Sequence, residues 1–329
     1  MRRWLVLAQG MWALVRELDW RPIRAQAETP PRIALLGAGP LVERVTRLLG
    51  TLKPVARGPL DLPLQAPLPD LTVLLPGQPE EVAAAMQRAA ELEAQDAGAV
   101  VLVPAGHEPS PPGGGYVVVD PAAPESEEQL ALTVLDATPS ERKLALGRAC
   151  LPLRGPLARQ LCQETAMANA QFALLANLPA ALPGVGAAGV GADIVILTKN
   201  QILLVYKLAA LWGARLDSPR ALFLELAPVV GGAFFWRTTA RALLGLVPGF
   251  AAVAPKVAVA YLGTYIVGGL ASAYYASGMR PDEARVREIE HEARQALAQA
   301  WRRLRPHDRR AAVEPAAAVT PPATPAPAH

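Results

Sequence analysis

The pattern of apolar and polar positions divides the chain into an alternating first part and a helical second part. Short apolar runs typical of buried strands lie at residues 32–36, 71–75, 99–103 and 116–119, and a weaker candidate lies at 54–56. Apolar residues at helical spacing follow the first run over 41–49 and the second over about 80–95. Strands that alternate with helices predict a mostly parallel sheet with helices on both faces, so we expect an α/β domain over residues 30–138.

After residue 138 the strand pattern ends, and helices broken by Gly/Pro turns continue to residue 305. We therefore predict an all-α, apolar domain over 139–305. Its helix from about 193 to 212 is apolar nearly all round, which is typical of a buried helix. Asp193, Asn200 and Lys207 recur in it every seven residues between leucines.

Buried polar groups are costly unless they are paired, so these side chains should pair across a helix contact. The partners we expect are Asn169, Asn177 or Gln171 in the preceding helix. Such a cluster would act as a clamp that fixes helix register, and the alternative is a polar functional site inside the bundle.

The two ends of the chain have compositions of their own. Residues 1–29 predict an amphipathic helix and a linker, because Trp4, Leu7, Met11 and Leu14 follow helical spacing beside arginines. That helix suits either a bilayer interface or the protein's own surface. Residues 306–329 are rich in Ala and Pro, and we expect them to be disordered because they cannot bury a core.

A long apolar block raises the question of a membrane. Residues 242–278 contain a single charge, Lys256, and 257–277 have none. That length suits one spanning helix of ~20 residues, whereas basic residues at both flanks favour a hairpin. The block is therefore a partly inserted hairpin or a buried core. We favour membrane association at the cytoplasmic face of the inner membrane, with a cytoplasmic protein as the alternative.

Composition and charge exclude several classes of binding site. Hydrophobic residues make up 52% of the chain and charged residues 19%, and the net charge of +3 shows no basic stripe for a nucleic acid. The two cysteines, Cys150 and Cys162, provide neither a disulfide framework nor a zinc ligand set. We expect no metal, no cofactor and no nucleic-acid partner.

The turn after the first strand is the one candidate for a bound cofactor. Gly37 and Gly39 match the start of a dinucleotide fingerprint, but Val42 replaces its third glycine and no acidic residue follows at the ribose position. The structural alternative is a tight turn between strand and helix. A Gly-Lys dipeptide does not occur in the chain, so it lacks a phosphate-binding P-loop. His107, Glu108 and Asp120 lie in loops, and we do not expect them to form an acid–base site.

Three motifs of the helical half carry a family resemblance. They are Asn177-Leu178-Pro179, the helix that begins Ala192-Asp193 and continues to Leu197-Thr198 and Gln201, and Ala227-Pro228 followed by Gly231-Gly232. Residues 161–278 thereby resemble the YcjF-like, GTPase-associated bacterial domain family of unknown function. The resemblance implies a helical domain that follows an Era-like GTPase domain, and membrane location in some members. The first half would then be a degenerate GTPase or Rossmann-like domain without its phosphate loop.

These observations favour a non-enzymatic, membrane-associated protein that acts as an interaction or regulatory module. A protein partner such as a GTPase would fit the resemblance, and a homo-oligomer is compatible with it. The alternative is a nucleotide or dinucleotide binder that uses the Gly37–Gly39 turn.

Overall fold

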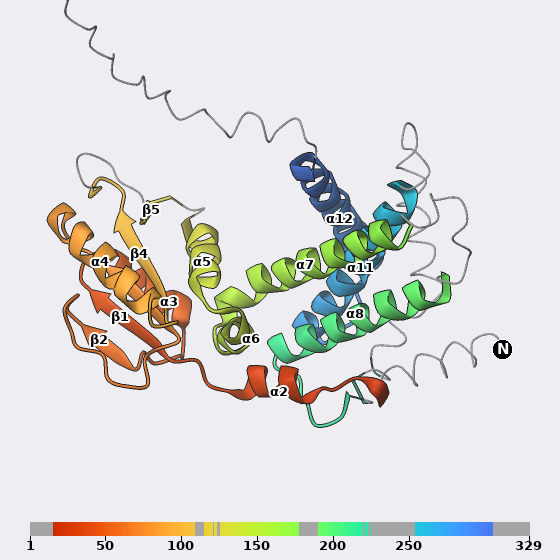
Figure 1. The fold of residues 1–329 in the computed structure, drawn as a ribbon, viewed down its shortest axis with the longest axis horizontal. Coiled ribbons are helices and arrows are strands. Elements are labelled where there is room, and N and C mark those ends of the chain that lie inside the picture. The colour runs from red at the N-terminus through yellow and green to blue at the C-terminus, as the bar shows by residue number, and fades with distance from the viewer. Residues whose placement is uncertain are drawn as a thin grey trace, which may run out of the picture.

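The computed structural model describes residues 16–108, 115–120, 122–123, 126–177, 190–219, 221–222, 225 and 254–304. An α/β half and a helical half lie side by side along the longest axis (Figure 1). The predicted tail at 306–329, the stripe from Trp4 to Leu14 and the motif at 227–232 lie outside the described residues, as do Leu178 and Pro179.

A five-stranded, all-parallel sheet forms the first half and confirms the predicted fold class. The strand order is β2-β1-β3-β4-β5. The bounds are Ile33–Gly37 for β1, Ala56–Gly58 for β2, Leu71–Leu75 for β3, Gly98–Pro104 for β4 and Val117–Val119 for β5. The weak strand expected at 54–56 is wrong by two residues. Pro54 has no N–H to donate, and the first contact with β1 is the Val55 N–H to the Ile33 carbonyl at 2.8 Å.

Both faces of the sheet are covered, as buried parallel strands require. Helix α4 (Val82–Glu93), preceded by the short helix η1 (Pro79–Glu81), packs on the face that carries Leu74 and Val101. Helices α3 (Leu41–Leu49) and α5 (Ser126–Ala137) belong to the core of the opposite face, with Val73 and Leu102. Alternate residues of one strand thus enter two different cores.

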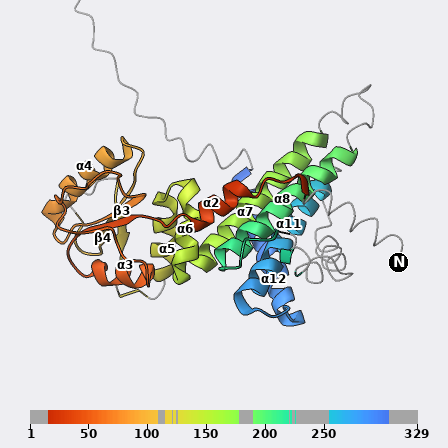
Figure 2. The same ribbon diagram turned by 90° about the horizontal axis from the view of Figure 1, so that it is seen from below.

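The helical half extends the core of that second face. It contains α6 (Ser140–Ala149), α7 (Leu151–Asn177), α8 (Val190–Leu211), α11 (Ala254–Ser277) and α12 (Glu283–Leu304). Helix α7 contacts α3 and α5 as well as α8 and α11 (Figures 1 and 2). A continuous cluster of buried apolar side chains therefore runs from the sheet into the bundle.

The helix that precedes the sheet in the sequence belongs to the helical half. Helix α2 (Arg21–Glu28) contacts α6 and α8, and it precedes β1 in the sequence (Figure 2). Ile23 and Ala27 are buried there, and the rings of Trp20 and Tyr206 lie 4.7 Å apart. Residues 21–28, which fall within the predicted N-terminal helix and linker, thus form a helix packed on the bundle.

Helix α11 is long and apolar enough to cross a membrane by length and composition. Its stretch Val257–Ser277 has a mean hydropathy of 1.4, and 72% of its most apolar window is buried inside the protein. Helices α7, α8 and α12 pack around it. A buried core helix has the same composition, so this feature is weak support for a membrane span.

Close packing around α11 depends on a glycine. A Cβ atom at Gly268 would lie 2.5 Å from the Cys162 sulfur of α7 and 2.9 Å from a methyl carbon of Leu204 of α8. The two neighbouring helices therefore approach this point more closely than any side chain permits.

We expect Gly268→Ala to lower the free energy of unfolding by roughly 1–3 kcal/mol, because the added methyl group overfills a packed core. The matched control is Gly155→Ala in α7, where nothing beyond the neighbouring residues lies within 4 Å of the added atom. That change should alter the free energy of unfolding by less than about 1 kcal/mol, because the helix propensity of Ala is opposed by Pro156, which disfavours a Cβ atom on the preceding helical residue. Thermal unfolding of the two variants measures the difference, and equal effects would contradict the packing argument.

Candidate functional site

The strand order places a topological switch point between β1 and β3, where open α/β sheets bind their ligands. The turn Gly37–Gly39 follows β1, and the turn at 76–78 follows β3. The two turns lie against each other, since a Cβ atom at Gly39 would be 3.5 Å from the Cα atom of Gly77. The predicted cofactor-binding residues Gly37 and Gly39 thus lie where a ligand would be expected.

Three backbone N–H groups of these turns have partners inside the protein. The Ala38 N–H donates to the Leu75 carbonyl at 3.0 Å. The N–H groups of Gly77 and Gln78 both donate to one carboxylate oxygen of Glu81, at 2.7 and 3.2 Å. An anionic ligand at the turn after β3 would compete with Glu81 for the Gly77 and Gln78 N–H groups and would meet its negative charge.

Gly37 has a structural role in this arrangement. Its φ angle is +118°, and a Cβ atom would lie 2.0 Å from the Leu75 carbonyl oxygen. Gly39 also has a positive φ angle, of +100°. The close contact with β3 accounts for Gly37 without any ligand, as the structural alternative expected.

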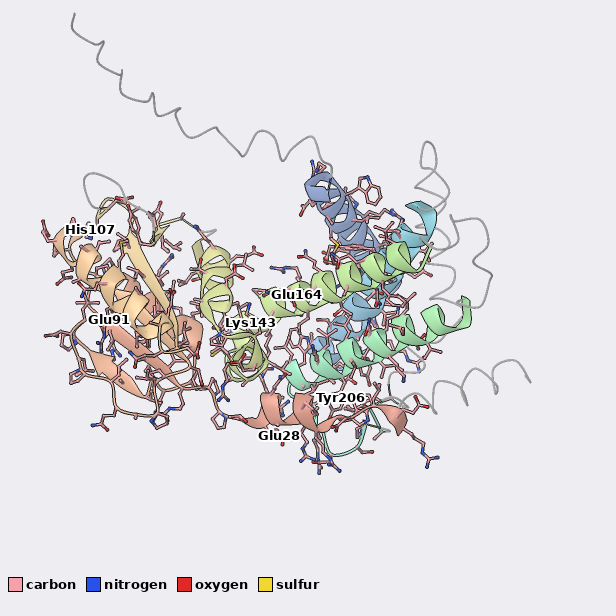
Figure 3. The ribbon with its side chains drawn as sticks, in the orientation of Figure 1. Glu28, Glu91, His107, Lys143, Glu164 and Tyr206 are labelled. Atoms are coloured by element: carbon pink, nitrogen blue, oxygen red, sulfur yellow. The ribbon has the colours of Figure 1, made fainter. Side chains whose placement is uncertain are left out.

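The carboxylates in the loops at the carboxyl edge of the sheet bond to backbone groups of their own loops. Glu108 accepts the Gly106 N–H at 2.8 Å, and Asp120 accepts the Ala122 N–H at 2.8 Å. His107 lies at this edge (Figure 3), and its Nδ1 atom is buried without a hydrogen bond in the described part of the chain. The two carboxylates therefore fix their own turns. Among the described residues, no group of three His, Cys, Asp or Glu side chains could hold a metal ion.

The two thiols are poor nucleophiles. Burial raises the pKa of Cys150 to about 12, an effect that the charge of Arg154 partly opposes. Burial also raises the pKa of Cys162 to about 12, and the carboxylate of Glu292 adds to the rise. Both side chains are therefore neutral thiols near pH 7 and do not supply a reactive thiolate.

A buried polar cluster joins three helices of the bundle. Asn200 of α8 donates to the side-chain oxygen of Asn169 of α7 at 2.7 Å. Asn169 in turn donates to the Thr264 hydroxyl of α11 at 2.8 Å and to the Leu197 carbonyl at 3.4 Å. Gln201 also donates to Thr264, at 3.2 Å. Asn169 and Thr264 are fully buried, so these bonds replace all contact with water.

The sequence identified only part of this cluster. Asn169 and Asn200 are in it, whereas Gln171 is exposed on α7 and the suggestion that it is a partner is wrong. Lys207 lies further along α8, and no described hydrogen bond joins it to the cluster. The side chains of Asn177 and Asp193 lie outside the described residues. Thr264 and Gln201 were missed, because their polarity is unremarkable until α11 and α8 are placed together.

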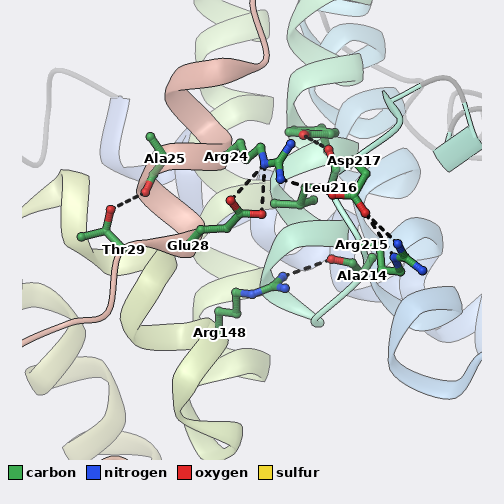
Figure 4. Close-up of polar contacts among 10 residues, drawn as sticks. Arg24, Ala25, Glu28, Thr29, Arg148, Ala214, Arg215, Leu216 and Asp217 are labelled. Atoms are coloured by element: carbon green, nitrogen blue, oxygen red, sulfur yellow. Dashed lines mark hydrogen bonds and ion pairs between the residues drawn. The ribbon is translucent and has the colours of Figure 1, made fainter.

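A second polar group fixes the end of α8 against α2 and α6 (Figure 4). Arg24 of α2 pairs with Glu28 at 2.9 Å and with Asp217 at 3.2 Å. Arg148 of α6 donates to the carbonyls of Ala210 and Ala214, near the last turn of α8. Cationic groups are favourable at a helix C-terminus, so Arg148 caps α8. Figure 3 shows Tyr206 and Glu28 at the same contact between α8 and α2.

A hollow of about 600 Å³ lies beside this group, at the C-terminal ends of α8 and α11. Its lining includes Trp212, Arg215, Asp217, Glu225 and Tyr275. Asp217 is paired with Arg215 at 3.1 Å and also with Arg24, and Glu225 accepts the Tyr274 hydroxyl at 2.7 Å. The charged groups of the lining are thus engaged with the protein itself.

The two halves define an α/β protein with an all-parallel sheet and an attached helical bundle. Comparisons of the chain with known protein families, with curated proteins and with solved structures found no match.

We expect Gly37→Ala to destabilise the protein by on the order of 3 kcal/mol, since the added methyl group would overlap the Leu75 carbonyl and strain a positive φ angle. Gly106→Ala is the control, because Gly106 has a φ angle of +86° and nothing within 4 Å. It should cost only the backbone strain, about 1 kcal/mol. Urea unfolding of both variants separates overlap from strain, and equal losses would show that the contact with β3 is unimportant.

Asn169→Ala should lower the free energy of unfolding by roughly 2–3 kcal/mol, because it leaves the Asn200 amide and the Thr264 hydroxyl with fewer partners in a buried position. Gln171→Ala, on the exposed face of the same helix, should change it by no more than about 0.5 kcal/mol. The midpoint of urea unfolding measures both. A loss at Asn169 no larger than that at Gln171 would rule out a stabilising clamp.

Proposed function

We propose that the chain is a membrane-associated, non-catalytic interaction or regulatory module related to GTPase-associated proteins. In this proposal the α/β half is a nucleotide fold that no longer holds a nucleotide. The observation that supports it most is the Glu81 carboxylate, which pairs with the Gly77 and Gln78 N–H groups at the switch point. A phosphate bound at the turn after β3 would compete for those donors, and the chain has no P-loop lysine to offset the charge of Glu81.

The chemistry of the remaining side chains supports a binding role rather than a catalytic one. The thiols of Cys150 and Cys162 have a raised pKa, and the carboxylates of Glu108 and Asp120 close their own loops. A module that does no chemistry itself acts by positioning a partner. The resemblance of the helical half to GTPase-associated domains makes a GTPase the partner that we propose.

Membrane association is supported by the apolar composition of the helical half. Its described exterior carries large aliphatic side chains, and the block over 242–278 has a single charge. We propose the cytoplasmic face of the inner membrane as the location, because that face would place the α/β half beside soluble partners.

A nucleotide or dinucleotide binder is the second candidate function. The position of Gly37 and Gly39 at the β1/β3 switch point favours it, since glycines with positive φ angles allow a ligand to approach the backbone. Binding would require the Glu81 carboxylate to leave the Gly77 and Gln78 N–H groups.

Thermal unfolding with and without GTP, GDP, NAD and NADP distinguishes the two functions. We expect no shift, because Glu81 occupies the donors that an anionic ligand needs. A bound nucleotide at 100 times its dissociation constant would stabilise the protein by ~2.7 kcal/mol. Glu81→Gln provides a matched variant that keeps the shape and removes the charge. Stabilisation of the wild-type protein by any of the four ligands would overturn the proposal that the α/β half no longer holds a nucleotide.

A further inference from the structure

Two arginines meet at the corner between α6 and α7. Arg148 lies in the last turn of α6 and Arg154 in the first turn of α7, and both residues are half-buried. The Arg154 Nη2 atom donates to the Arg148 carbonyl at 2.8 Å, so its side chain folds back over the corner.

Both guanidinium groups reach the same short stretch of chain after α8. The Arg148 Nη1 atom donates to the Ala214 carbonyl at 3.3 Å (Figure 4). A Cβ atom at the preceding residue, Gly213, would lie 3.9 Å from the Arg154 Nη2 atom. Two full positive charges therefore lie beside consecutive residues.

The described part of the chain does not balance these two charges. Neither arginine forms an ion pair with a carboxylate there. Burial lowers the pKa of Arg154, and the positive charge of Arg148 lowers it further. The Nε atom of Arg154 is also buried without a hydrogen bond in the described residues. The corner thus holds more positive charge than its surroundings satisfy.

Capping of helix ends accounts for only part of this arrangement. The hydrogen bonds to carbonyl groups use one nitrogen of each guanidinium, which has five N–H donors in all. Carbonyl groups carry partial charges only, so they do not neutralise two cations. Arg154 also lies in the first turn of α7, where the helix dipole disfavours a positive charge. An anion would satisfy both the remaining donors and the excess charge.

The corner is accessible from outside. Leu151, which lies between the two arginines in the sequence, is 69% exposed. Gly213 has no side chain, and beyond its chain neighbours the described residues place only Arg154 within 4 Å of the position of a Cβ atom. A small group can therefore approach the arginines at this point.

We propose that the corner formed by Arg148 and Arg154 binds a phosphate group. A phosphate dianion balances two positive charges whereas a carboxylate balances one, and planar guanidinium groups match the spacing of phosphate oxygens. The phosphate belongs either to a free phosphorylated molecule or to a lipid headgroup. This inference goes beyond the proposed function, and it depends neither on membrane association nor on the switch point of the sheet.

The test is calorimetric titration of the purified full-length chain with inorganic phosphate, and with acetate at the same ionic strength. Arg154→Gln keeps a donor for the Arg148 carbonyl and removes the charge, and we expect it to weaken phosphate binding by at least about tenfold. Arg57→Gln is the control, because Arg57 is an exposed arginine of β2 in the other half of the protein. It should bind phosphate as the wild type does.

Three results of this titration would overturn the inference. They are no binding of phosphate by the wild type, equal affinity in Arg154→Gln, and binding of acetate as tight as that of phosphate. Thermal unfolding in chloride checks that both variants remain folded.

Modification of the wild-type protein by phenylglyoxal, a reagent for arginine, gives a measurement that requires no variant. Phosphate should slow the modification of Arg148 and Arg154 and leave that of Arg57 unchanged, as read by mass spectrometry of peptides. Equal rates with and without phosphate would contradict the proposal. So would a lack of any reaction at the two arginines in chloride, because an anion could not reach them either.

Vesicles of phosphatidylcholine, with and without phosphatidic acid, identify the source of the phosphate. If the source is a lipid headgroup, phosphatidic acid should strengthen flotation of the wild type but not of Arg154→Gln. If it is a free molecule, the two proteins should float alike while only the wild type binds inorganic phosphate.

The same variant separates this inference from the proposed function. GTP, GDP, NAD and NADP also carry phosphate groups, so a stabilisation of the wild type that Arg154→Gln abolishes belongs to the corner. A stabilisation that persists in Arg154→Gln belongs to the switch point and counts against the proposed function alone.

Discussion

Helix α7 runs from the sheet into the bundle, and the burial of its apolar residues along this path is what makes the two halves one structure. Near its start, Leu157 packs so closely on Gly147 of α6 that a methyl group there would lie 2.5 Å away. Further along, the small residues Ala166 and Ala170 are buried, and Cys162 contacts Gly268 of α11. Small side chains on both helices allow close approach, and the gain in packing stabilises both halves together.

The hydrogen bonds of the polar cluster can form only when α7, α8 and α11 are packed together. Asn169 lies on the buried side of α7, and its amide can be satisfied only when α8 and α11 are in register. Apolar contacts between helices tolerate sliding, whereas a buried amide that loses its partners carries a large desolvation cost. The cluster thus selects one alignment of helices whose apolar surfaces alone would permit several.

At the switch point of the sheet, where open α/β sheets bind ligands, polar groups are likewise paired within the chain. A carboxylate of the same chain, Glu81, satisfies the backbone donors of the turn after β3, and the Leu75 carbonyl accepts from the turn after β1. The N–H groups of Ala38, Gly77 and Gln78 are thus paired within the chain.

Much of this fold could be predicted from the sequence, and the reason is periodicity. A run such as Leu71–Leu75 is apolar at every position because both faces of a parallel strand are buried, and residues 41–49 repeat at helical spacing, so both elements are local properties. β2 was misplaced by two residues because its pairing with β1, rather than its own composition, defines it.

The sequence by itself determined the class of the two halves, the strands and helices with strong periodicity, and the absence of a P-loop. Only the tertiary structure decided that Thr264 is the partner of Asn169, that Glu81 closes the switch point, and that α2 packs on α6 and α8. It also decided that most of α11 is buried by its neighbours, which composition could not distinguish from burial in lipid. The physical reason is that these features depend on contacts between distant parts of the chain, such as the 95 positions that separate Asn169 and Thr264, and no local pattern encodes them.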